Sequence, residues 1–217
     1  MKGPAMIYEV RTYVVKPRSM PEVEKRFGEK YEQRKKYSEL TAFWKTEVGP
    51  LNQFMHVWGY KDLAERATIR AAAVKDGAWP PPLSEFLVSQ KSEIMNQTPF
   101  SPEMKPSNNG PFFEWREYTH APGQLPIMMK NWEVALSTRT QFGPITALWY
   151  SELGGLNKWI HVWPYKTLDQ RNEVRNKAHD TGDWPPSARA KKDGRPVEIL
   201  VAQENKIVTP SSFSPIK

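Results

Sequence analysis

Residues 47–63 have the sequence EVGPLNQFMHVWGYKDL, and residues 152–168 repeat it as ELGGLNKWIHVWPYKTL. The two segments are 105 positions apart, and this offset aligns Asn52 with Asn157 and His56 with His161. The same offset aligns residues far outside the two segments, such as Glu9 with Glu114, Arg11 with Arg116, Trp44 with Trp149 and Trp79 with Trp184. Such a long match without gaps indicates that the chain is a tandem repeat of two similar units.

Composition places the chain among globular proteins. It has 217 residues, of which 39% are hydrophobic and 25% charged, and each repeat is long enough to bury a core. No apolar run has the length of a transmembrane helix or the character of a signal peptide. There is no cysteine, so we expect no disulfide and a cytoplasmic location. Met6 could itself be the natural start, which would make residues 1–5 an extension or a remnant of a tag.

The net charge of +7 raises the question of a nucleic-acid partner. Basic residues gather at positions 25–36, but glutamates alternate with them there, as on the solvated face of a helix. Because a basic balance without a binding motif is weak support, we expect no nucleic-acid partner. A small-molecule ligand and a homo-oligomer are the partners that we leave open.

Residues 7–15 alternate in polarity and are rich in β-branched and aromatic residues, which predicts a strand. A first helix should follow, with Ser19 and Glu22 at the spacing of a capping box. Residues 40–47 and 52–60 predict two more strands, joined by a turn. Asp62 and Glu65 again have capping-box spacing, as do Thr167 and Gln170 in the second repeat, and predict a second helix that ends at Gly77 in the first repeat. Residues 86–95 predict the fourth strand.

Each repeat is therefore expected to be a ferredoxin-like α+β unit, with both helices on one face of an antiparallel sheet. We place the first unit at residues 6–105 and the second at 111–217, with a linker within 96–111 that is rich in Pro, Asn and Ser. The chain ends also match, but at an offset of 113 between Phe100 and Phe213. We place the extra eight residues of the second unit in a charged loop at 188–196. The free faces of the two sheets should meet and form a barrel about a pseudo-twofold axis.

Alternation along the strands predicts which side chains share a face. We expect the aliphatic set, which includes Val10 and Val57, to face the helices. The opposite set would then line the space between the sheets, and it comprises Glu9, Arg11, Tyr13, His56, Trp58 and Tyr60 with Glu114, Arg116, Tyr118, His161, Trp163 and Tyr165. Two hypotheses compete for this set. In the first, the buried polar groups satisfy one another, Glu9 with Arg11 and His56 with a carboxylate or carbonyl. In the second, they line a pocket in which an imidazole moves a proton on a small organic molecule. A surface role for the strand is a third.

Other patterns say less about chemistry. Arg66 and Arg70 share a helix face, and we expect them to tie the helix to Glu47 or to the chain end, with an anion clamp as the alternative. Trp79 and Trp184 should be hydrophobic plugs. The four histidines have no metal-ligand spacing, and the chain carries no phosphate loop, nucleophile elbow or dinucleotide motif. We therefore expect no metal and no cofactor.

The segment GPLNQFMHVWGYKDLAERATIR at residues 49–70, followed by the pair Trp79 and Pro80, resembles the NIPSNAP family. The segment GGLNKWIHVWPYKTLDQRNEVR at residues 154–175 carries the same pattern, except that Gly155 replaces Pro50. The resemblance implies the dimeric α/β-barrel fold, in tandem within one chain. It supplies no reaction, because the family has none that is generally established. Animal members are mitochondrial and are linked to vesicle transport and damage signalling. Relatives by fold include haem-binding proteins and cofactor-free monooxygenases or isomerases.

Three functions from different classes follow. The first is a NIPSNAP-type protein of unknown biochemical role that binds a small organic molecule between its sheets, or serves as a scaffold. The second is a cofactor-independent monooxygenase or isomerase that uses the barrel interior, so the chain is not assigned as an enzyme or as a non-enzyme. The third is a protein-interaction module that acts through the Trp-Pro loops or the basic helix. A solid barrel interior would weaken the second and favour the third.

Overall fold

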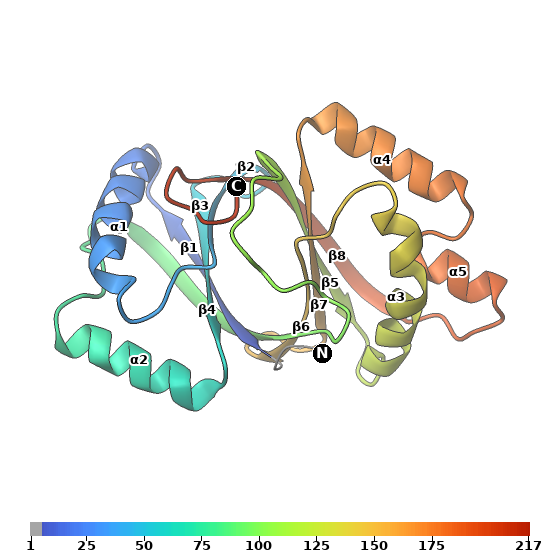
Figure 1. Ribbon diagram of the computed structural model, residues 1–217, viewed down its shortest axis with the longest axis horizontal. Coiled ribbons are helices and arrows are strands. Elements are labelled where there is room, and N and C mark those ends of the chain that lie inside the picture. The colour runs from blue at the N-terminus through green and yellow to red at the C-terminus, as the bar shows by residue number, and fades with distance from the viewer. Residues whose placement is uncertain (1–5) are drawn as a thin grey trace.

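The computed structural model describes residues 6–217, so the expectation about residues 1–5 lies outside the described residues. The first repeat runs in the order strand, helix, strand, strand, helix, strand (Figure 1). Its elements are β1 (Ile7–Val15), α1 (Met20–Arg34), β2 (Ala42–Val48), β3 (Gln53–Tyr60), α2 (Leu63–Lys75) and β4 (Leu87–Gln97). No helix within residues 6–217 is long and apolar enough to cross a bilayer.

The second repeat has the same order with one additional helix. Its elements are β5 (Phe112–His120), α3 (Leu125–Thr140), β6 (Ala147–Leu153), β7 (Lys158–Tyr165), α4 (Leu168–Asp180), α5 (Pro186–Lys192) and β8 (Leu200–Pro210). The extra helix α5 corrects our expectation of an irregular charged loop at 188–196. Pro186 at its first turn and alanines at its centre favour a short helix there.

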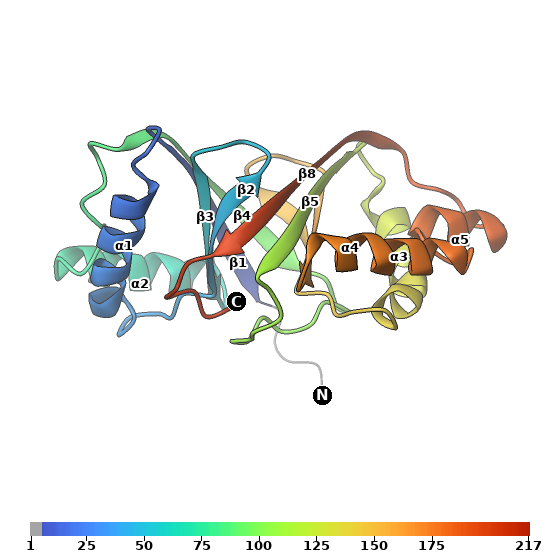
Figure 2. The same cartoon turned by 90° about the horizontal axis from the view of Figure 1, so that it is seen from above.

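The eight strands form one closed barrel in the order β1, β3, β2, β8, β5, β7, β6, β4. Strands from the two repeats meet twice, where β4 pairs with β6 and β2 pairs with β8, both antiparallel. Helices α1 and α2 cover the outside of the barrel on one side, and α3, α4 and α5 cover it on the other (Figures 1 and 2). The predicted α+β fold, two ferredoxin-like units closed into an intramolecular barrel, is confirmed.

Apolar side chains fill the barrel interior. Trp44, Trp115 and Trp149 pack there with Val10 and Val57, all nearly inaccessible to solvent. Trp44 and Trp115, from different repeats, have ring centroids 6.3 Å apart, and Trp115 lies 5.8 Å from Trp149. Aromatic contacts of this kind add to the free energy gained by burying the rings. The hydrophobic contact between the repeats is therefore a packed core.

The assignment of strand faces was wrong. His56, Trp58 and Tyr60 pack with helix α1 and not in the barrel interior, and the same holds for their counterparts in the second repeat. We had expected the aliphatic faces of the strands to pack against the helices, because helices commonly cover apolar faces. Here both faces of each sheet are covered, so polarity alone does not separate inside from outside. The polar and aromatic set lies between sheet and helices because α2 and α4 supply arginines that pair with its carboxylates.

The segments that follow β4 and β8 cross to the opposite repeat. Phe43 N–H in β2 donates to Ser214 Oγ at 3.0 Å, and Leu148 N–H in β6 donates to Ser101 Oγ at 3.0 Å. Phe213 packs against Phe27 and Phe43 of the first repeat. We call residues 98–101 and 211–214 the exchanged arms. Part of the predicted linker is therefore packed structure, since Thr98 is buried.

Capping was predicted correctly for two helices. The Asp62 side chain accepts from Glu65 N–H at 2.8 Å, and the Thr167 hydroxyl accepts from Gln170 N–H at 3.0 Å, as expected of a capping box. The box predicted at Ser19 was wrong. Ser19 does precede the first helical residue, but its hydroxyl donates to the Lys16 carbonyl at 2.6 Å instead of accepting from the helix.

Candidate ligand cavity of the second repeat

A buried carboxylate with several arginines lies between the sheet and the second helix of each repeat. Glu9 is inaccessible to solvent, and its Oε1 accepts from Arg11 at 2.8 Å and from Arg66 at 2.6 Å, while Arg70 lies 3.4 Å from Oε2. The Arg11 pair was predicted. Arg66 and Arg70 do hold their helix to the sheet, but through Glu9, so the expected partner Glu47 was wrong.

The second repeat builds the same cluster. Glu114 Oε1 accepts from Arg116 at 2.9 Å and from Arg171 at 2.6 Å, and Arg175 lies 3.6 Å from Oε2. Burial would raise the pKa of Glu114, but the hydrogen bond from Arg171 and the charges of Arg116 and Arg175 outweigh it, so the pKa is lowered. One carboxylate thus faces three guanidinium groups in each repeat.

The histidine of each repeat is paired with the tryptophan two residues further along its strand. Trp163 Nε1–H donates to His161 Nδ1 at 2.6 Å, and Trp58 Nε1–H donates to His56 Nδ1 at 2.7 Å. An indole nitrogen only donates, so each Nδ1 is unprotonated and a neutral ring carries its proton on Nε2. We had expected a carboxylate or carbonyl as the partner. Nε2 of both histidines has no hydrogen-bond partner among the described residues.

Both histidines are held in the neutral form. Burial lowers the pKa of His161 well below its usual value, and the charges of Arg116, Arg175 and Arg139 lower it further. Burial likewise lowers the pKa of His56, with Arg11 acting in the same direction. A neutral imidazole with a free Nε2–H is a hydrogen-bond donor to whatever lies next to it.

A cavity of about 220 Å³ lies next to His161. Its aromatic lining comprises Tyr118, Trp132, Trp163, Tyr165 and Trp184, and its charged lining comprises Arg116, Arg139, Arg175 and Glu198. Trp132 and Arg139 come from α3, Arg175 from α4, and the others from the sheet or from the segments that flank α5. A cavity of about 150 Å³ is enough to hold a benzene ring. This cavity is therefore large enough for a small aromatic molecule.

The first repeat fills its helix-side core differently. Leu83 is buried there, in one cluster with Phe27 and Trp79. The residue aligned with Leu83 at the offset of 105 is Ala188, which belongs to α5 and has a much smaller side chain. In the second repeat, helix α5, which packs on α3, thus stands where the first repeat has the buried side chain of Leu83.

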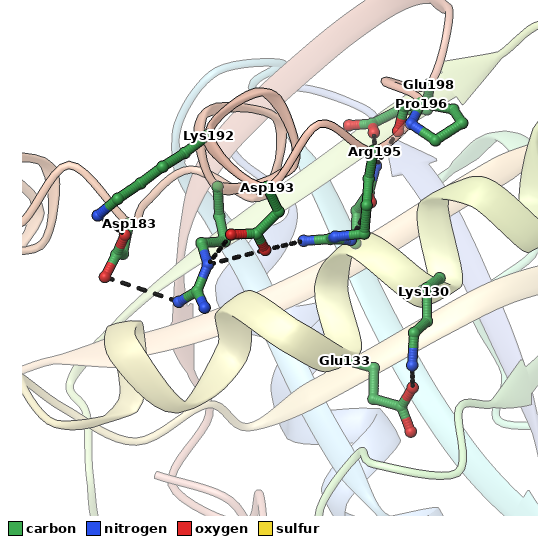
Figure 3. A network of polar contacts seen from close by, with 10 residues as sticks. Lys130, Glu133, Asp183, Lys192, Asp193, Arg195, Pro196 and Glu198 are labelled. Carbon is green, nitrogen blue, oxygen red and sulfur yellow. Dashed lines mark hydrogen bonds and ion pairs between the residues drawn. The ribbon is translucent and has the colours of Figure 1, made fainter.

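Ion pairs hold α5 and the segment after it in place (Figure 3). Asp193 accepts from Arg189 at 2.9 Å and from Arg195 at 3.0 Å, and Lys192 lies 2.7 Å from Asp183. Asn131 on α3 donates to the Pro196 carbonyl at 3.0 Å and to Glu198 at 2.8 Å. Because Pro186 and Glu198 line the cavity, this network fixes one of its walls.

The predicted site residues have different surroundings in the two repeats. Five of the six from the second repeat line the cavity, namely Arg116, Tyr118, His161, Trp163 and Tyr165, while Glu114 holds Arg116. Those of the first repeat, Glu9, Arg11, Tyr13, His56, Trp58 and Tyr60, make the equivalent contacts among themselves and with α1 and α2.

Sequence reasoning missed Trp132, Arg139 and Trp184 as cavity residues. Arg139 had a signal, since it aligns with Arg34 at the offset of 105 and each stands three residues after an apolar residue of its helix, Leu136 and Tyr31. An arginine kept at the same buried position in both copies indicates a function or a fixed partner. Trp184 was taken only as a plug, a role that its burial and its contact with Trp132 confirm.

The closed barrel of two ferredoxin-like units defines the class, a dimeric α/β barrel contained in one chain. The NIPSNAP family model matches residues 8–102 and 113–215, and the chain belongs to the NIPSNAP family. Human NipSnap homolog 3B is 30% identical over 217 residues, which cover 97% of this chain and 85% of the relative. Human NipSnap homolog 3A is 29% identical over 222 residues, which cover 98% and 86%.

Solved structures share the whole fold at low identity. A putative monooxygenase from Fusobacterium nucleatum superimposes with a TM-score of 0.62 at 11% identity, over 95% of this chain and 92% of that one. An anthrone oxidase-like protein gives a TM-score of 0.63 at 8% identity, over 99% and 94%. At such identities the likeness shows the fold alone.

Proposed function

We propose that this NIPSNAP protein binds a small organic molecule in the cavity of its second repeat, between the sheet and the helices. The observation that carries the proposal is His161 Nε2, a buried donor without a protein partner beside a cavity of about 220 Å³. A buried donor left unpaired costs about 1–3 kcal/mol. A ligand with an oxygen acceptor at this position would remove that cost.

The proposal moves the binding site away from the space between the two sheets, where we had first expected it. Tryptophans and aliphatic side chains occupy that space. The packed interior leaves the enzyme hypothesis without the reaction chamber it invoked, and it favours the protein-interaction module over that hypothesis. The cavity beside His161 supports ligand binding more than the interaction module. A cytoplasmic location remains part of the proposal, and fractionation of the source cells tests it.

The test uses two matched variants, His161→Phe and His56→Phe. Each removes the acceptor of a buried tryptophan N–H, so each should lower the free energy of unfolding by about 1–3 kcal/mol. Only His161→Phe changes a histidine that lines the cavity. Native mass spectrometry of protein purified from its own host should show a bound small molecule on the wild type and on His56→Phe, and little or none on His161→Phe.

The same measurements can contradict the proposal. A wild-type protein without a bound molecule would do so, and so would a molecule retained equally by both variants. If neither variant lost stability, the His–Trp hydrogen bonds would not be structural either, and the enzyme hypothesis would gain ground.

A further inference from the structure

Arg139 is a buried cation with little to neutralise it. Its side chain is 2% exposed, and it forms no ion pair with a carboxylate among the described residues. Its Nη2 donates to the Tyr165 hydroxyl at 2.9 Å, and its guanidinium lies 4.1 Å from the centroid of the Trp163 ring. Nη1 has no hydrogen-bond partner within residues 6–217. Burying such a charge is costly unless something pairs with it.

The nearest carboxylate cluster does not solve this problem. Glu114 already faces Arg116, Arg171 and Arg175, so the region between sheet and helices carries more positive than negative charge. Glu198 on the cavity wall is held by Asn131 at 2.8 Å. The excess positive charge favours the binding of an anion in this region.

Space for an anion lies on both sides of Arg139. This residue and Tyr165 line the cavity beside His161 and also a second cavity of about 120 Å³. Gly143 lines the second cavity, and a Cβ atom at Gly143 would lie 3.9 Å from Arg139 Nη1. Arg139 Nη1 therefore lies near the wall that Gly143 forms in this second cavity. The residue aligned with Gly143 in the first repeat is Ser38, which has a side chain where Gly143 has none.

We propose that the ligand of this site is a small aromatic acid, whose planar ring contacts the tryptophans and His161 and whose anionic group pairs with Arg139. This inference rests on the proposed function and narrows it to a chemical class. A planar guanidinium matches a carboxylate through two parallel hydrogen bonds, and tryptophan faces match an aromatic ring. The neutral Nε2–H of His161 then donates to a second oxygen of the ligand or to its ring face.

The experiment compares acids with their neutral amides. Benzoate, benzamide, 1-naphthoate and 1-naphthamide are titrated into the full chain, and binding is measured by calorimetry and by ligand-observed NMR. The wild type should bind at least one acid, about tenfold or more tightly than the amide of the same shape, because hydrogen bonds to charged groups are the stronger ones. Arg139→Gln should remove this preference, whereas Arg34→Gln, the matched change in the first repeat, should keep it.

The outcomes separate the two proposals. If acid and amide bind the wild type equally well and His161→Phe weakens both, the cavity binds ligands but the acid class is wrong. If none of the four probes binds the wild type, the inference and the proposed cavity both fail. Should Arg139→Gln not fold, the preference for acid over amide in the wild type decides alone.

Discussion

Glu9 shows how one side chain can fix a helix to a sheet. Burial would raise the pKa of its carboxyl, but the hydrogen bond from Arg66 and the charges of Arg70 and Arg11 lower the pKa to about 2. The ordinary value is 4.5. Since the folded pKa is the lower one, the stabilisation is fully present above pH 4.5 and is lost as the pH falls through 2.

We therefore predict that Glu9→Gln lowers the free energy of unfolding at pH 7 by about 3 kcal/mol, since it leaves three arginines without their shared carboxylate. The difference between wild type and variant should shrink as the pH falls from 4.5 towards 2. Urea unfolding across this range measures it. Glu85→Gln is the control, because Glu85 is exposed where it pairs with Arg26 and should cost less than about 1 kcal/mol. A loss at Glu9 that does not change with pH would contradict the ion-pair explanation.

At the scale of elements, sequence patterns predicted the strands, most helix boundaries and the barrel closure. They failed to predict which face of each strand lies inside the barrel. Val10 and Val57 on one face and Tyr13 and Trp58 on the other are all buried. A strand covered on both faces has no solvent side from which to infer the other. The one usable signal was charge, since Arg66 and Arg70 on a helix need a carboxylate and Glu9 lies on the polar face. Helix α5 was missed because its seven residues include three basic ones, which resemble a loop.

The sequence predicted several residues of the candidate site, but not the cavity that they line. Identical residues in both repeats identified His161, Arg116 and Tyr165. The cavity itself depends on what the second repeat lacks, namely a plug equivalent to Leu83, and a missing side chain leaves no pattern in a single sequence. Packing in three dimensions decides whether space remains.

The exchanged arms allow a prediction for the first residues of β2 and β6. Ser214→Ala and Ser101→Ala each leave a backbone N–H in the partner repeat without its acceptor, Phe43 in one case and Leu148 in the other. Each change should cost about 1–3 kcal/mol of stability and should speed hydrogen exchange at that one amide. Ser212→Ala, at an exposed position of the same arm, is the control. Unchanged exchange at Phe43 in Ser214→Ala would show that the arm does not hold the start of β2.

At the scale of the whole molecule, the two repeats share a single hydrophobic core. Trp44, Trp115 and Trp149 belong to it, and strand pairing joins β4 to β6 and β8 to β2. Neither repeat alone could cover these rings. The repeats are thus two units in topology and one unit in stability.

We predict that a chain divided between Asn108 and Asn109 still forms this core. Co-expressed halves should assemble into one complex of one copy each, measured by size exclusion with light scattering. Either half alone should aggregate or pair with itself, because it exposes the barrel face of its sheet. Trp149→Asp in the second half is the control and should prevent assembly. Halves that remain separate, soluble monomers would contradict a shared core.

The presence of both halves in one polypeptide has a genetic consequence. In a symmetric assembly of two identical chains, every substitution appears at both sites, so a change that improves one site and burdens the fold is imposed twice. Here Gly143 can differ from Ser38, and α5 can exist in one half only. A gene for such a chain can keep one copy as a stable frame while the other acquires a specificity of its own.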